Sequence, residues 1–262
     1  DNKWDPTNAR SLIEYSIKKG YKFFGFELGN EQNNRFTGAE EVADFLILAK
    51  LLEELYPDAS SRPKIIGPDP HSFRTKNPNT DWLASFMDEA MKNKLDMFAI
   101  THHEYIEVDV NTTTDPSLLD TTLNIGQHVY EAVQQHYPQA ETWAGEIGPH
   151  NGGSPPCSHE SMRWANYADT FWYLDAMGSK AAAGYSAFCR QDFIGADYGL
   201  LDCMTHTPLP DYYGNYIWTR VMGTGVLNTT VSGSTHIRAY AHCSARSRGG
   251  VSIVLMNLDQ KE

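Results

Sequence analysis

The chain has 262 residues, enough for one large domain or for one domain and part of another. Its 33 acidic and 21 basic residues give a net charge of −12, which argues against binding of nucleic acid or another polyanion through a basic surface. No apolar run of about 18 residues is present, so no transmembrane segment is predicted. The first residues, DNKWDPTNAR, lack the apolar core of a signal peptide, so either the protein is cytosolic or an upstream part is missing.

Helices and strands alternate along the first 190 residues. Apolar spacing, capping residues and stop signals predict a helix that Thr7 or Asn8 caps and Gly20 ends, and further helices over about 38–56, from Asp81, from Asp115 and over 160–177. Short apolar runs predict strands at 22–30, 63–69, 95–102, 141–147 and 184–191. This order, with short connections, predicts a parallel sheet covered by helices.

Two architectures fit such a sheet, a doubly wound fold and a (β/α)₈ barrel. The turn after the first strand, GNEQNN, does not match the phosphate-binding pattern GxGxxG. Polar residues instead follow all five strands, where barrel enzymes carry their active sites. We therefore predict a (β/α)₈ TIM barrel that is partial, because a closed barrel needs three more strand–helix units before the first helix.

The pattern changes at about residue 223. From there to the end, the sequence alternates with period two around Gly and Ser turns, which predicts antiparallel β structure that does not complete a sandwich. We expect the barrel portion to comprise residues 1–222 and part of a C-terminal antiparallel β domain to comprise residues 223–262. We therefore expect the chain to be an internal fragment of a longer protein.

Two glutamates are placed as a glycosidase needs them. Glu31 ends the first apolar strand beside Asn30, and Glu146 ends another strand between Gly145 and Gly148, small neighbours that would leave it accessible to a sugar. Glycoside hydrolysis uses one carboxyl group as acid and another as base or nucleophile, held by one rigid scaffold. A solvated loop carboxylate is the alternative for each residue, and mid-strand Glu27 is predicted to be a buried, paired structural group.

Other polar groups fit supporting roles. His102 and His103 point to opposite faces of a strand, so we predict no metal site and expect one of them to form hydrogen bonds. Asp69 and His71 follow another strand, while Arg190, Gln191, Asp197 and Tyr198 follow the last one; each could equally be loop structure. Four dispersed cysteines are consistent with buried thiols or with disulfides. The sequons at Asn111 and Asn228 matter only if the protein is secreted.

Six stretches together carry a family resemblance. They are FELGNEQN at 26–33, KIIGPD at 64–69, ITHHEY at 100–105, WAGEIG at 143–148, RQDFIGADYGLLD at 190–202 and PLPDYY at 208–213. The chain resembles the heparanase and β-glucuronidase family of retaining glycoside hydrolases, family 79, whose acid/base and nucleophile follow strands four and seven of a (β/α)₈ barrel. The resemblance implies that strands 4–8 are present here, that no cofactor is needed, and that the protein is secreted, extracellular or lysosomal. It also implies that Cys243 pairs with a cysteine beyond this chain.

The resemblance assigns roles to individual residues. Glu31 would be the acid/base, Glu146 the nucleophile and Tyr105 a support for that nucleophile. The substrate contacts that the resemblance implies are Asn30 with the sugar 2-hydroxyl, Gly152 and Gly153 with the uronate carboxylate, and Gln191, Asp197 and Tyr198. Asp69, His103 and Tyr105, which lie at strand exits, are further candidates for contact with the sugar.

Departures from the family pattern bear on the substrate. Asn151 stands where the family usually has tyrosine, and Asp197 where it often has asparagine; an aspartate would repel a uronate unless protonated or paired. Only Arg74 and Lys76 follow GPD, so a glucuronide or a weakly charged glucuronic acid-containing glycan is expected rather than a highly sulfated chain. A non-catalytic carbohydrate-binding pseudoenzyme and a hydrolase of the same clan acting on a neutral sugar remain alternatives.

Overall fold

The structure, a computed structural model, describes residues 3–71, 73–106, 112, 114–150 and 166–259. The chain divides into two compact units. The first unit comprises residues 1–72, 79–103 and 129–145, and the second comprises residues 73–78, 104–128 and 146–262.

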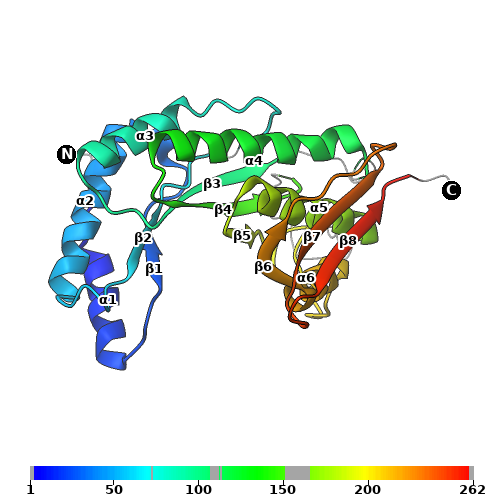
Figure 1. The fold of residues 1–262 in the computed structure, drawn as a ribbon. Coiled ribbons are helices and arrows are strands. Elements are labelled where there is room, and N and C mark those ends of the chain that lie inside the picture. Colours follow the sequence, from blue (N-terminus) through cyan, green and yellow to red (C-terminus); the bar gives the residue numbers. More distant parts are fainter. Residues whose placement is uncertain (1–2, 72, 107–111, 113, 151–165, 260–262) are drawn as a thin grey trace. The chain divides into compact units, whose positions relative to one another are not determined.

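The first unit contains three whole helices, the last part of α4 (Pro116–His136) and the start of a parallel sheet (Figure 1). The helices are α1 (Thr7–Lys19), α2 (Gly38–Leu55) and α3 (Asp81–Lys92), and a 3₁₀ turn covers Gln32–Asn34. The strands are β1 (Gly25–Glu27), β2 (Lys64–Gly67) and the first residues of β3 (Ala99–Tyr105) and β4 (Glu141–Gly148). β1 pairs with β2 and β2 with β3, both in parallel, so their carboxyl ends lie along one edge.

Local sequence signals explain where the helices begin and how they pack. A capping box starts α2, in which the Thr37 hydroxyl accepts from the backbone N–H of Glu40 and the Glu40 carboxylate accepts from the backbone N–H of Thr37. Gly38 lets α2 approach α3, since an added Cβ would lie 2.5 Å from the backbone nitrogen of Phe86. The predicted Thr7 or Asn8 cap is wrong: α1 begins at Thr7 itself after Pro6, with no side-chain cap.

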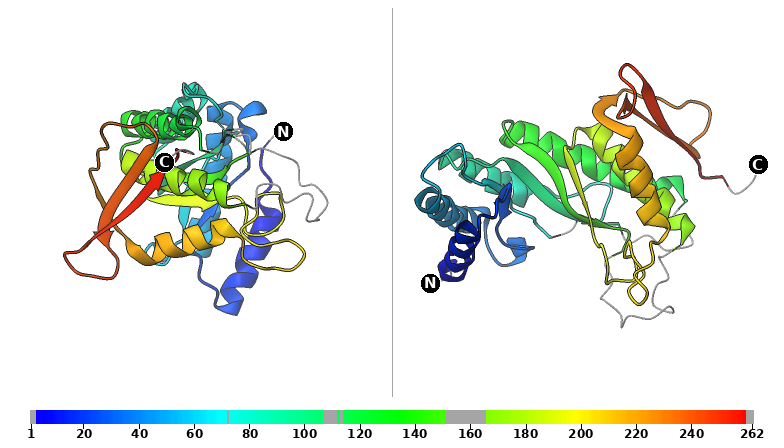
Figure 2. Two further views of the ribbon diagram at one scale, coloured as in Figure 1. Left: turned by 90° about the vertical axis from the view of Figure 1, so that its right-hand side faces the viewer. Right: turned by 90° about the horizontal axis from the view of Figure 1, so that it is seen from below.

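The second unit contains the remaining elements (Figures 1 and 2). They are the ends of β3 and β4, β5 (Ala187–Arg190), the first part of α4 (Pro116–His136), α5 (Tyr167–Ala183), α6 (Pro210–Val221), β6 (Met222–Leu227), β7 (Ile237–Ser244) and β8 (Val251–Asn257). β6, β7 and β8 form an antiparallel sheet, coloured orange to red, beside α5 and α6.

The predicted sheet is confirmed in its main features. Five strands lie in the order β1-β2-β3-β4-β5 with helices between them, and the antiparallel strands after residue 222 are present. The first strand, predicted at 22–30, is shorter in the structure: only Gly25–Glu27 form β1, and Phe23 and Phe24 before it are exposed. Helix α6 was not predicted, and residues 160–165 of the helix predicted at 160–177 lie outside the described residues. No helix in the described ranges is long and apolar enough to cross a membrane.

A buried carboxyl joins α5 to β7 in the second unit. The Tyr240 hydroxyl donates to Oδ1 of Asp175 at 2.7 Å, and the Tyr240 ring fills the space above Gly178, where an added Cβ would lie 2.2 Å from ring atoms. Burial raises the pKa of Asp175 to about 6, against the hydrogen bond from Tyr240 and the charge of Arg238, which lower it. The folded protein therefore binds the proton of the Asp175 carboxyl more tightly than the unfolded chain does.

A pH-dependent stability follows from this carboxyl. Because the folded-state pKa is raised, its contribution is fully present below about pH 3.8 and is lost as the pH rises through about 6. Relative to wild type, Asp175→Asn in the full-length protein should gain on the order of 3 kcal/mol in unfolding free energy between pH 4 and pH 7. Urea unfolding at several pH values measures this difference. Exposed Glu131→Gln is the control, and an equal response of both variants would contradict the assignment.

Candidate active site

The exits of β1 and β2 share an uncommon backbone conformation. Glu31, four residues after β1 ends, has φ 53° and ψ 40°, and Asp69, two residues after β2 ends, has φ 49°. Both are left-handed values that non-glycine residues rarely adopt. The backbone N–H of Glu31 donates to the backbone oxygen of Asp69 at 3.0 Å. This bond holds the two turns, and thus the two carboxyl groups, together in the first unit.

His103 on β3 lies between these carboxyl groups. Its Nδ1 is 3.0 Å from Oε1 of Glu31, and its Nε2 is 3.4 Å from Oδ1 of Asp69. The imidazole is buried, while the Glu31 side chain keeps 29% of its surface exposed. Both ring nitrogens of His103 therefore face carboxyl oxygens of its own unit. Glu31 alone of the three reaches solvent appreciably.

Glu27 is paired with Asp69, as the sequence analysis expected of a structural carboxyl. Although Glu27 as a residue is exposed on the edge strand β1, its carboxyl is hydrogen-bonded to Asp69 and Thr101. Burial of the carboxyl and the neighbouring charge of Asp69 raise the pKa of Glu27 to about 8. Burial alone would raise the pKa of Asp69 as well, but hydrogen bonds with His103 and Glu27 hold it below its ordinary value. At neutral pH the proton of the pair therefore resides on Glu27.

Thr101 and Gly145 also contact or adjoin Asp69, and neither role was predicted. The Thr101 hydroxyl accepts from the backbone N–H of Asp69 at 3.0 Å. A Cβ on Gly145 would lie 2.1 Å from Oδ1 of Asp69, so only glycine fits there. The alternation of polar residues in THHEY was the signal for Thr101, which shares its strand face with His103.

Glu146 in the second unit is held by a row of two tyrosines. The Tyr105 hydroxyl donates to Oε1 of Glu146 at 2.5 Å, and Tyr105 is in turn hydrogen-bonded to Tyr198. Burial and the bond to Glu146 raise the pKa of Tyr105 well above its usual range, so the phenol stays a proton donor. Gly148 accommodates the Tyr105 ring, because an added Cβ would lie 2.6 Å from it. Gly145 and Gly148 beside Glu146 thus make room for protein side chains, Asp69 and Tyr105, and not for sugar as predicted.

A buried arginine holds the loop that carries Tyr198. The Arg190 guanidinium donates to the backbone oxygen of Tyr198 at 3.0 Å and pairs with Asp211 at 3.1 Å and Asp169 at 3.4 Å. It also lies over the rings of Trp172, Tyr173 and Tyr198. Burial and the charge of Asp211 raise the pKa of Asp169 well above its ordinary value. Asp211 belongs to the PLPDYY stretch, and its contact with Arg190 was not predicted.

The other predicted site residues fall into three groups. Asn30 is exposed beside Glu31, and Gln191 is half-buried with its backbone N–H donating to Ile147. Asp197 is buried in the loop before Tyr198. Gly152, Gly153 and the sequon asparagine Asn111 lie outside the described residues, whereas Asn228 is exposed. Their direct contacts with substrate stay predictions, as does the expected lack of a metal or cofactor.

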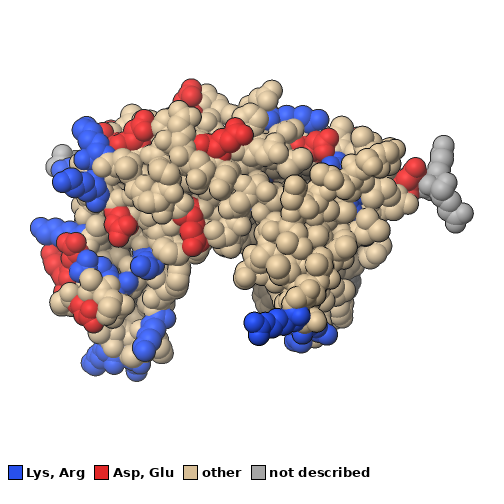
Figure 3. Space-filling model, viewed as in Figure 1, with Lys and Arg blue, Asp and Glu red and all other residues tan. Residues whose placement is uncertain are grey.

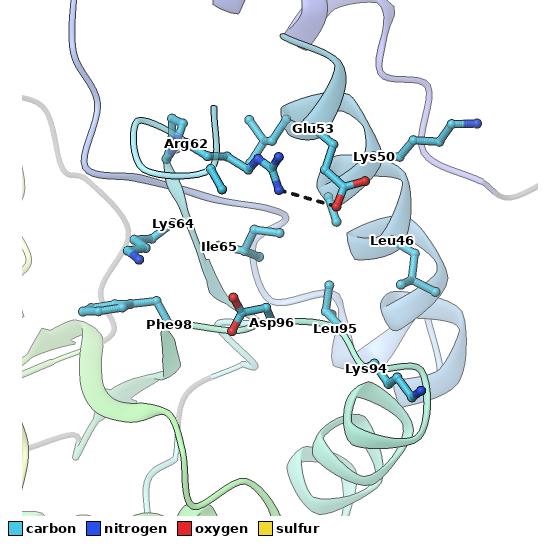
Figure 4. Close-up of a pocket in the computed structure, with 14 residues that line it drawn as sticks. Leu46, Lys50, Glu53, Arg62, Lys64, Ile65, Lys94, Leu95, Asp96 and Phe98 are labelled. Atoms are coloured by element: carbon cyan, nitrogen blue, oxygen red, sulfur yellow. Dashed lines mark hydrogen bonds and ion pairs between the residues drawn. The ribbon is translucent and has the colours of Figure 1, made fainter. Parts of the chain in front are cut away.

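A separate hollow of about 550 Å³ lies at the opposite ends of the strands in the first unit (Figure 4). Lys64 at the start of β2 and Asp96 and Phe98 before β3 line it together with residues of α2. Arg62 and Glu53 form an ion pair of 3.5 Å at its rim. This hollow is therefore distinct from the strand exits that carry Glu31 and Asp69.

Comparisons with known proteins show the family to which the chain is similar. Residues 1–178 match the family model described as glycosyl hydrolase family 79, N-terminal domain. Curated relatives include baicalin-beta-D-glucuronidase from Scutellaria baicalensis, 34% identical over 98% of this chain and 48% of that protein, and heparanase from Rattus norvegicus, 31% identical over 98% and 49%. Heparanase-like protein 2 from Arabidopsis thaliana is 31% identical over 98% and 47%. The chain thus spans about half the length of these relatives.

Solved structures share the fold at low sequence identity. The glucanase-xylanase CelM2 from a metagenome library aligns with a TM-score of 0.71 at 13% identity, over 97% of this chain and 58% of that one. A 4-O-alpha-L-rhamnosyl-beta-D-glucuronidase from Fusarium oxysporum aligns with a TM-score of 0.60 at 15% identity, over 97% and 55%. These likenesses support a barrel-like parallel sheet of the kind found in glycosidases.

Proposed function

Because the chain belongs to glycosyl hydrolase family 79, we propose that the protein containing it is a retaining β-glucuronidase in which Glu31 is the acid/base and Glu146 the nucleophile. Glu31 protonates the departing oxygen while Glu146 attacks the anomeric carbon and the glycosidic C–O bond breaks. Water then attacks the same carbon, the bond to Glu146 breaks, and Glu31 takes the proton from water.

The observation that carries this proposal is that Glu31 and Glu146 differ in their hydrogen-bond partners. Glu31 contacts an imidazole nitrogen and remains partly exposed, as a group that exchanges protons with substrate and water must. Glu146 accepts a 2.5 Å hydrogen bond from a phenol, which fixes the direction of the attacking carboxylate. Retaining chemistry further requires about 5–5.5 Å between the two carboxyl groups.

For the substrate, we propose a glucuronide or a glucuronic acid-containing glycan of low charge density. The relatives include proteins named as a glucuronidase and a heparanase, which supports a uronic acid. On the face drawn in Figure 3, Lys and Arg are interspersed with Asp and Glu over α1 and α2, so this view of the described residues offers no continuous basic surface for a highly sulfated chain. Asn30, Gly152, Gly153, Gln191, Asp197 and Tyr198 are the proposed contacts with the sugar.

A substrate comparison tests this function. The full-length protein should hydrolyse 4-nitrophenyl β-glucuronide with a kcat/KM at least ~100-fold above that for the matching glucoside or xyloside, because a site built to bond a carboxylate rejects sugars that lack it. Comparable or greater turnover of a neutral glycoside would instead support a clan hydrolase of neutral-sugar specificity. Binding of glucuronide without turnover of any substrate would support the non-catalytic alternative.

The proposed location is outside the cytosol, in a secreted or lysosomal compartment. Cys203 is in a disulfide, whereas Cys189 and Cys243 are reduced thiols on exposed residues. Structural disulfides persist mainly in oxidising compartments. The exposed sequon at Asn228 is accessible to glycosylation there.

A further inference from the structure

The turn after β1, which carries Glu31, is bonded to the turn after β2 at two points within the first unit. The backbone N–H of Glu31 donates to the backbone oxygen of Asp69 at 3.0 Å. The backbone N–H of His71 donates in the opposite direction, to Oδ1 of Asn33 at 2.6 Å. The first bond joins backbone atoms alone, so it does not depend on which side chains are present. The second bond exists only because residue 33 has a side chain that reaches and accepts, and that residue is Asn33.

Two further hydrogen bonds hold the turn after β1 on either side of Asn33. The side-chain amide of Gln32 donates to the backbone oxygen of Asn30 at 2.7 Å. The indole N–H of Trp82 on α3 donates to the backbone oxygen of Phe36 at 2.8 Å. The turn is thus attached to α3 where it ends, while Asn33 attaches its middle to the turn after β2.

Glu31 needs these attachments because its backbone is left-handed, with φ 53° and ψ 40°. A residue with a Cβ adopts this conformation at a cost and keeps it only where the surrounding structure holds it there. In this conformation Oε1 of Glu31 lies 3.0 Å from Nδ1 of His103, and 29% of the Glu31 side chain is exposed. A change of φ and ψ at Glu31 would redirect its Cα–Cβ bond and move the carboxyl away from His103.

Building on the proposed function, we propose that Asn33 is a positioning residue for the acid/base: by accepting from the His71 N–H, it holds the turn in the conformation that directs the Glu31 carboxyl to the glycosidic oxygen. Glu31 remains the group that gives and takes the proton, and Asn33 acts on the reaction only through it. Because a displacement of about 1 Å is enough to weaken a catalytic group strongly, loss of this one bond should impair the acid/base without removing it.

Asn33→Ala removes the acceptor for the His71 N–H and leaves Glu31 in the chain. Acid assistance matters for a poor leaving group and little for a good one, which departs without a proton. The variant should therefore lower kcat/KM for phenyl β-glucuronide about 10²-fold, but for 2,4-dinitrophenyl β-glucuronide by less than about threefold. On the dinitrophenyl substrate kcat and KM should fall together, because base-assisted hydrolysis of the glycosyl–enzyme becomes slow and this intermediate accumulates.

Three further variants separate positioning from a general loss of structure. Asn33→Asp keeps a side-chain oxygen that accepts from the His71 N–H and should recover kcat/KM on the phenyl substrate to within about fivefold of wild type. Asn33→Gln moves the same amide outward by one methylene and should give the substrate difference of Asn33→Ala at about a tenfold loss, which provides a second test if the alanine variant does not fold. Asn34→Ala, at the next and exposed residue of the same 3₁₀ turn, is the matched control and should behave as wild type on both substrates.

The experiment measures kcat and KM of the full-length protein and these variants on both aryl glucuronides, with a thermal melting curve for each variant to establish that it is folded. Equal losses of kcat/KM on the two substrates for folded Asn33→Ala or Asn33→Gln, or no loss on either substrate, would overturn the proposal. So would failure of Asn33→Asp to recover activity, or the same substrate difference in Asn34→Ala. Failure of the wild-type protein to hydrolyse either glucuronide would instead refute the proposed function on which the proposal rests.

Discussion

Replacing Glu146 with alanine in the full-length protein is expected to reduce hydrolysis of an aryl β-glucuronide by about 10⁴-fold or more, the scale of loss when a covalent nucleophile is removed. The carboxylate that forms the glycosyl–enzyme bond is then absent, while Tyr105 has lost the group to which it donates. A small anion such as azide should enter the vacated space, attack from the same side and give the α-glucuronyl azide. Steady-state kinetics and identification of the azide product measure both effects.

Glu141→Gln on the same strand is the control, because Glu141 begins β4 and bonds the Trp143 indole rather than Tyr105. It should leave kcat near the wild-type value. An activity-based glucuronide probe should label Glu146 in wild type and in Glu141→Gln. Undiminished activity of Glu146→Ala, or labelling at another residue, would refute the assignment of the nucleophile.

The largest stability effect is expected at Lys180, a fully buried cation on α5. Its ammonium donates to Oε2 of Glu104 at 2.5 Å and to the backbone oxygen of Thr122 at 2.8 Å. Burial raises the pKa of Glu104 and lowers that of Lys180, in each case against the attraction of the partner. Lys180→Met leaves the Glu104 carboxyl buried without its cation and should cost about 3–5 kcal/mol of unfolding free energy.

The double variant Lys180→Met with Glu104→Leu distinguishes this cause from loss of packing. Both charges are then replaced by apolar side chains of similar volume, which is often neutral or stabilising. Denaturant unfolding should place the double variant within about 1 kcal/mol of wild type. If it is as unstable as Lys180→Met alone, the cost lies in packing around Gly126, whose missing Cβ makes room for the Lys180 stem.

Those parts of the fold that depend on local signals were predictable. Thr37 followed by Glu40 begins α2, and Gly20 in a left-handed conformation ends α1, because capping is decided within a few residues. Helix α6 was not predicted, although Pro210 at its first position is a helix-start signal that can be read from the sequence. The length of β1 was overestimated because an apolar run does not reveal which of its residues find a pairing partner.

The site was predictable only to its candidate residues. Strand-exit positions indicated Glu31 and Glu146, and the resemblance gave Tyr105 a supporting role. The pairing of Glu27 with Asp69 depends on a contact between residues 42 positions apart, which no local pattern reports. The need for glycine at position 145 likewise arises from Asp69, a residue of another strand exit.

Strand β3 has a consequence for how the chain tolerates change in length. Thr101, His103 and Tyr105 contact Asp69, Glu31 and Glu146, whereas Glu104, between the last two, contacts Lys180. Because side chains alternate between faces, inserting or deleting one residue before Thr101 would exchange the two sets. Lys180 would then lose the carboxylate of Glu104, and Glu31 and Glu146 would lose His103 and Tyr105. The spacing of residues within β3 is therefore fixed by both sets of contacts at once.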